Sequence, residues 1–253
     1  MIERLSLKAI LRRSAGIWWR DFAPIAMLGL GLVTVPEVIM HLIGAIGTTA
    51  PSTDTLVTTI RALTRLMYVG TVMAATLSSA DALSPRVYMI AGLQRLQKPL
   101  ITGLTVLAAL IGVLIVGQLA ALFLAPMARL LAVPVSLACL TIWFVAMPVA
   151  AARQTAPLAA LRYSTRLILP AKWQVFVLVA GLLLVSAAIL LGMALVIFGA
   201  GSSSDQVRTG IETMGPTTMG FWISQLVSVL LLGFLSVVPA VLYGTLSQQK
   251  GRT

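Results

Sequence analysis

The sequence predicts an all-α polytopic membrane protein with six transmembrane helices arranged as three hairpins. Its composition is the first indication: 59% of the 253 residues are apolar and only 10% are charged. Soluble domains carry about 25% charged residues, so this chain could not cover a water-exposed surface. The second indication is that its apolar residues form runs of about 20, the length with which one helix crosses a bilayer.

Four apolar runs contain no Asp, Glu, Lys or Arg and predict spans near residues 100–124, 130–152, 174–199 and 219–244. Two earlier runs, near 22–46 and 62–83, also predict spans, although each contains ionisable residues. No segment between these spans is long enough to form a separate domain. We therefore expect residues 1–253 to form a single membrane domain.

The distribution of Lys and Arg predicts the orientation of the spans. The N-terminal segment, the connections after the second and fourth spans and the C-terminal tail hold 14 of the 18 Lys and Arg residues, and the opposite connections hold 4. Cytoplasmic loops carry the excess of these residues in membrane proteins. We therefore expect a protein of the cytoplasmic membrane with both termini in the cytoplasm.

Each predicted hairpin is preceded by a basic amphipathic stretch, near residues 6–18, 85–96 and 157–168. Two of them begin with a proline, which suits the first turn of a helix because its missing N–H has no helical partner there. An apolar stripe beside Lys or Arg is typical of a helix that lies flat at the membrane interface. The candidate lipid- or partner-binding face consists of Lys8, Arg12, Arg13, Arg86, Arg95, Lys98, Arg162, Arg166 and Lys172.

Several short motifs resemble those of one group of bacterial membrane proteins. They are Met147-Pro148, the stretch Ala160-Leu161-Arg162-Tyr163-Ser164, the stretch Lys172-Trp173-Gln174-Val175-Phe176 and the segment from Leu7 to Trp19. In this layout the chain is similar to the YciC-like proteins and to their relatives called glycerophosphoryl diester phosphodiesterase membrane domain. The resemblance implies a six-helix membrane domain of poorly defined function.

The sequence departs from that family pattern at one motif. The family has Ala-Leu-x-Arg-Ser-Trp, whereas here Tyr163 separates the Arg from the Ser and no Trp follows Ser164. The phosphodiesterase label belongs to a catalytic barrel that is fused to some relatives, and this chain does not contain that barrel. The resemblance therefore does not imply phosphodiesterase activity.

Glu37 and His41 lie four residues apart and therefore share one face of the first predicted span. Such a pair could bind a metal ion or pass a proton, because ionisable residues inside a membrane are costly to bury. Arg61 and Arg65, also four apart, lie near the outer end of the second span, at a similar expected depth. We favour an ion pair between Glu37 and one of these arginines, since two ligands make a poor metal site.

The sequence offers little for catalysis. It contains one histidine and one cysteine, and it has no zinc-protease, nucleophile-elbow or phosphate-loop motif. Asp81 could act as a relay carboxylate, but pairing with Arg86 or Arg153 is the simpler interpretation. We therefore expect no enzyme activity, no cofactor and no metal.

The net charge of +11 is concentrated in clusters between apolar runs, which favours anionic lipid headgroups over nucleic acid as the partner. The leading hypothesis is a non-catalytic membrane protein that acts through lipid and helix contacts, either by self-association or as an accessory subunit of a larger complex. The main alternative is a transporter or channel for a small or lipid-like solute. A membrane enzyme is the second alternative and would require at least two convergent acids.

Overall fold

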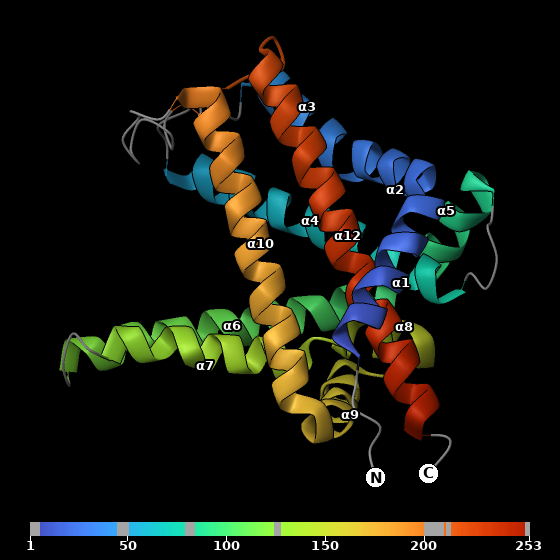
Figure 1. The fold of residues 1–253 in the computed structure, drawn as a ribbon. Coiled ribbons are helices and arrows are strands. Elements are labelled where there is room, and N and C mark those ends of the chain that lie inside the picture. The colour runs from blue at the N-terminus through green and yellow to red at the C-terminus, as the bar shows by residue number, and fades with distance from the viewer. Residues whose placement is uncertain are drawn as a thin grey trace.

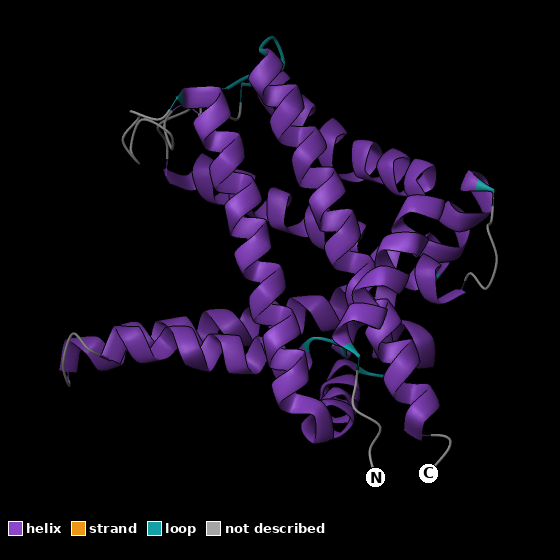
Figure 2. Cartoon of the chain, viewed as in Figure 1, coloured by secondary structure: helices purple, strands orange, loops and turns teal. Residues whose placement is uncertain are grey.

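The computed structural model of the chain describes residues 6–44, 51–78, 84–123, 128–199, 210 and 214–250. Every regular element in these ranges is a helix, and no strand occurs among them (Figure 2). The prediction of an all-α fold is therefore confirmed. The sequence also predicts loops at residues 47–55 and 201–218 and a turn around 125–129, and these lie partly outside the described residues, as Asp81 does wholly. Where they are described, residues 51–55 belong to α4, whereas the sequence predicts a loop there.

Three helices cover the basic amphipathic stretches of the sequence. They are α1 (Leu7–Arg20), α5 (Pro85–Gln94) and α9 (Pro157–Ile168). The hydroxyl of Ser6 caps α1 by accepting the Ala9 N–H at 3.3 Å, and Ser84 caps α5 by accepting the Val87 N–H at 3.5 Å. Such caps satisfy backbone N–H groups that have no helical partner.

Five helical segments in the described part of the chain are long and apolar enough to cross a membrane. The first consists of α2 (Phe22–Gly29), the π-helix η1 (Leu30–Thr34) and α3 (Val35–Leu42). The others contain α6 (Gln97–Phe123), α7 (Ala128–Trp143) with α8 (Ala146–Arg153), α10 (Lys172–Phe198), which the short η2 (Leu169–Ala171) joins to α9, and α12 (Met219–Lys250). A membrane location is compatible with these segments.

The one predicted span that is not among those five segments is the second in chain order, near 62–83. It corresponds to α4 (Pro51–Ser78). It is less apolar than they are because it contains Arg61, Arg65 and several threonines. Its C-terminal half lies at the centre of the molecule, where Tyr68, Val72 and Ala75 are completely buried. The predicted span near 62–83 also extends past the last described residue of α4.

The helices do not all pack as sequential hairpins. α6 and α7 form a close hairpin that extends away from the rest of the molecule (Figure 1). In contrast, α12 packs more extensively against α4 and α1 than against α10. α1 packs against α12, whose C-terminal end lies at the bottom of Figure 1. The core is therefore built around α4 and α12.

Two helix breaks occur beside prolines. Pro36 has no N–H, and its ring would clash with the carbonyl of Leu32 in an α-helix. The preceding π-helix widens the backbone, and the N–H of Val35 donates to the carbonyl of Leu30, five residues back. Between α7 and α8 the chain turns before Pro148, and the buried hydroxyl of Ser164 on α9 donates to the Ile142 carbonyl at 2.7 Å. This bond ties α9 to the break.

Candidate functional site

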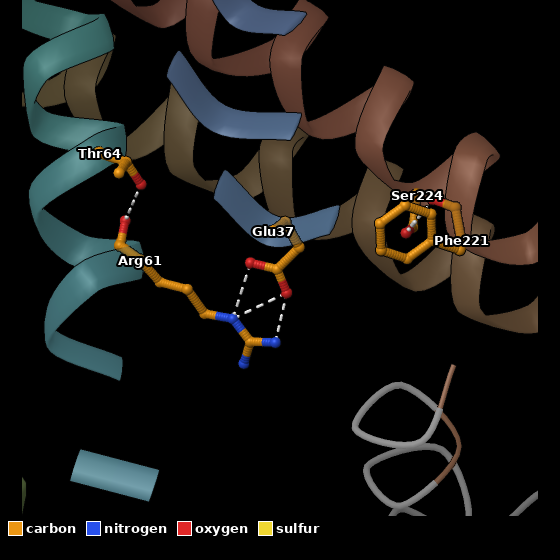
Figure 3. A network of polar contacts seen from close by, with 5 residues as sticks. All are labelled: Glu37, Arg61, Thr64, Phe221 and Ser224. Atoms are coloured by element: carbon orange, nitrogen blue, oxygen red, sulfur yellow. Dashed lines mark hydrogen bonds and ion pairs between the residues drawn. The ribbon is translucent and has the colours of Figure 1, made fainter. Parts of the chain in front are cut away.

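Glu37 and Arg61 form an ion pair between α3 and α4, one of the two pairings that the sequence favours (Figure 3). The Arg61 Nε lies 2.9 Å from each Glu37 carboxylate oxygen, and a second guanidinium nitrogen also contacts Oε1. Glu37 is only 7% exposed, whereas the Arg61 side chain is 29% exposed. This charge-assisted contact therefore holds the carboxylate in place and links α3 to α4.

His41 and Arg65 belong to the same cluster, although neither contacts the ion pair directly. His41 lies at the end of α3, and its ring meets that of Phe221 at the start of α12 edge-on, with 5.3 Å between centroids. Arg65 is exposed one turn after Arg61 and interacts electrostatically with both Glu37 and Arg61. The structure therefore brings the four predicted residues together in what we call the α3–α4 cluster.

The chemical repertoire of the α3–α4 cluster is narrow. No group of three His, Cys, Asp or Glu side chains that could hold a metal comes together within the described ranges. The Glu37 carboxylate already binds Arg61, and the Thr34 hydroxyl, buried one turn earlier, has no hydrogen-bond partner in the described part of the chain. The arrangement suits charge pairing and anion binding more than proton transfer or metal ligation.

A second candidate site is the basic surface, defined by the nine residues of α1, α5, α9 and the starts of α6 and α10 that the sequence singles out. All nine are exposed except Lys98, which is half-buried. The only acids whose side chains the structure describes are Asp21 and Glu37, and both are buried beside an arginine. The Asp21 carboxylate accepts a hydrogen bond from the Nε of Arg20 at 2.8 Å. Among the described side chains, therefore, no exposed carboxylate offsets the basic surface.

Aromatic side chains fix the helices of the basic surface to the core. The guanidinium of Arg153 lies 3.8 Å from the centre of the Tyr163 ring and donates to its hydroxyl at 2.7 Å. On α5, the completely buried Tyr88 lies 3.2 Å from the Thr76 hydroxyl of α4. Burial raises the pKa of Tyr88, which keeps the phenol neutral. Tyr88 and Tyr163 therefore both position helices of the basic surface.

Sequence reasoning missed Tyr68, which links three helices. Its buried hydroxyl on α4 lies 3.1 Å from the carbonyl of Val229 on α12 and 3.3 Å from that of Ile25 on α2. A single tyrosine within an apolar run gives no sequence signal for such a role. The nearby Gly233 on α12 does hint at a close approach, because the Tyr68 hydroxyl occupies the space beside its α-carbon.

The described part of the chain is all-helical, with five helical segments suited to crossing a membrane, an ion pair between α3 and α4, and a basic surface. No protein-family model, curated protein or solved structure matches the chain.

Proposed function

We propose that this chain is a non-catalytic component of the bacterial inner membrane whose basic surface binds anionic lipid headgroups or the helices of a partner membrane protein. In this proposal α1, α5 and α9 lie flat on the cytoplasmic face, each before a transmembrane hairpin. Both termini are cytoplasmic. The resemblance to the YciC-like proteins fits this proposal, because it implies a six-helix membrane domain.

One observation carries the proposal: the basic surface is exposed, and no exposed acid among the described side chains neutralises it. Each Lys or Arg near an anionic membrane surface contributes about 1 kcal/mol to attraction. The apolar sides of the same helices pack on the core, since Ile10 of α1, Tyr88 of α5 and Ile168 of α9 are all buried. This arrangement presents the charge outward, toward headgroups or a partner.

The proposal counts α4 as a membrane span, which brings the total to six. A helix that other helices enclose needs less apolar surface than one that faces lipid, and the inner half of α4 is buried against α12 and α5. The contact of His41 with Phe221 also supports the proposed topology, because the chain order places both residues at outer span ends. Without α4 as a span, those two residues would lie at opposite membrane faces.

The geometry of the α3–α4 cluster favours this proposal over the transporter alternative. Coupled transport places ionisable groups in an accessible site near the middle of the membrane. Here Glu37 closes on Arg61 and is 7% exposed, so its carboxylate already has a partner. We therefore keep the transporter as the alternative that the experiment must distinguish.

The functional test replaces Arg12, Arg13, Arg162 and Arg166 together by Gln in the full chain. Replacing the same four by Lys is the matched control, because it keeps the charge. Native purification should recover much less anionic phospholipid and partner protein with the Gln variant and unchanged amounts with the Lys variant. Equal recovery from both variants, or solute uptake by liposomes containing the purified protein alone, would overturn the proposal.

The topology is tested separately with reporter fusions. A fusion at Gln249 should report the cytoplasm and one at Thr209 the periplasm. Five spans, as would result if α4 stayed outside the membrane, would place the two termini on opposite sides. A periplasmic signal at Gln249 therefore rejects the six-span arrangement.

A further inference from the structure

We propose that Arg65, with Arg61, binds the phosphodiester group of a phospholipid in the outer leaflet. This site lies on α4, apart from the basic surface, and the inference rests on the six-span topology of the proposed function but not on what the basic surface binds. It rests on the charge, exposure and position of the α3–α4 cluster.

The α3–α4 cluster carries one more positive charge than its own residues neutralise. Arg61 and Arg65 contribute two positive charges, and the single Glu37 carboxylate is already bound to Arg61. Arg65 has no hydrogen bond or ion pair within the described ranges: Glu37 attracts it only at a distance, and Arg61 repels it. An unpaired guanidinium is costly near a bilayer core, so a partner with one negative charge is expected.

Arg65 is placed where a lipid phosphate can reach it. It is exposed on α4, within the first turn of the predicted span near 62–83 and at its outer end. An arginine there can lay its aliphatic stem along apolar surface while its guanidinium points to the headgroups. Leu66, Met67 and Val69, which follow Arg65 towards the membrane interior, are half-buried and offer apolar surface for acyl chains. These features favour a lipid over a free anion.

A phosphodiester matches the cluster in both charge and shape. It bears a single negative charge, which brings the sum over Arg61, Arg65, Glu37 and the ligand to zero. A guanidinium donates two parallel N–H bonds to phosphate oxygens, a geometry that lysine cannot reproduce. Glu37 fixes Arg61 from the protein side through its Nε and one terminal nitrogen. Arg65 then supplies the main contact with the phosphate.

The test uses the full chain, delipidated in a neutral detergent, and follows its thermal unfolding as didecanoyl phosphatidylcholine is added. This lipid has a phosphodiester but no net charge, so it does not respond to the basic surface as an anionic lipid would. The unfolding midpoint of the wild type should rise with lipid. Arg65→Gln should need about tenfold more lipid for half the effect, as the loss of one charge-assisted contact implies. Arg65→Lys should fall between the two.

Three controls make the outcome decisive. Didecanoylglycerol, which lacks the phosphate, should give a much smaller rise, and inorganic phosphate should give none. Arg153→Gln, at an exposed arginine on α8, should respond to phosphatidylcholine like the wild type. The proposal fails if Arg65→Gln keeps the wild-type response, if the phosphate-free lipid is equally effective, or if inorganic phosphate reproduces the effect. It also fails if the wild type shows no response, as would happen if an acid of the chain itself neutralised Arg65.

Discussion

The helices α4 and α6 differ in a way that reverses the rule for soluble proteins. α6 is strongly apolar, yet only 11% of the residues in its most apolar stretch are buried within the chain. α4 is less apolar and contains Thr71, Thr76 and Tyr68, all of them buried. In a bilayer, lipid contact demands apolar side chains, whereas a helix enclosed by protein can use polar ones for interhelical bonds. Of these two helices, the more apolar one is therefore the one that the rest of the chain covers less.

The largest effect should come from truncating α4 at its centre. Tyr68→Ala removes a completely buried ring and the hydroxyl between α2 and α12, so we expect a loss of about 3–5 kcal/mol in unfolding free energy. The matched change Ile111→Ala on α6, where Ile111 is 47% exposed, should cost less than about 1 kcal/mol. Equilibrium unfolding in mixed micelles measures both. Similar losses at the two positions would break the comparison.

The next effect concerns the ion pair that joins α4 to α3. Glu37→Gln leaves the Arg61 guanidinium without its carboxylate, and we expect a loss of about 2–3 kcal/mol. This is less than for a fully buried pair because Arg61 keeps 29% exposure. Adding Arg61→Gln should recover part of the loss in the same unfolding assay. Strictly additive losses would mean that the two side chains do not interact in the folded protein.

A smaller loss of unfolding free energy should follow when a methyl group is added to α5 where it packs against α4. A Cβ added at Gly92 would lie 2.6 Å from both the carbonyl oxygen and the methyl group of Thr71. Since one of these atoms is backbone, Gly92→Ala must push α5 away from α4, which costs about 1–2 kcal/mol. A lower unfolding midpoint that is accompanied by unchanged helix content would show this displacement. An unchanged midpoint would mean that α5 is free to move.

The sequence predicts the helices of this protein better than their packing. Proline and serine start signals locate α5 and α9, and the long apolar runs locate α6, α10 and α12. The similar expected depth of Glu37, Arg61 and Arg65 also limits the partner of Glu37 to one of the two arginines. Lipid-facing helices carry this strong apolar signal, whereas the enclosed α4 does not, so its central position is not evident from composition. The packing of α12 against α4 depends on single contacts such as Tyr68 with Val229.

The smallest expected effect tests what faces α6. A Cβ added at Gly112 meets no described atom within 4 Å outside the backbone of its own helix, so the face of α6 around this glycine contacts no other described part of the protein. If lipid covers that face, Gly112→Ala should be tolerated and should stabilise the helix slightly, by less than about 1 kcal/mol, because Ala has the higher helix propensity. The unfolding midpoint would then rise or stay unchanged. If a helix of a second copy or another protein packs closely on this glycine, the added methyl group would weaken that contact. A lower midpoint that depends on protein concentration would therefore show that protein, and not lipid, covers this side of the α6–α7 hairpin.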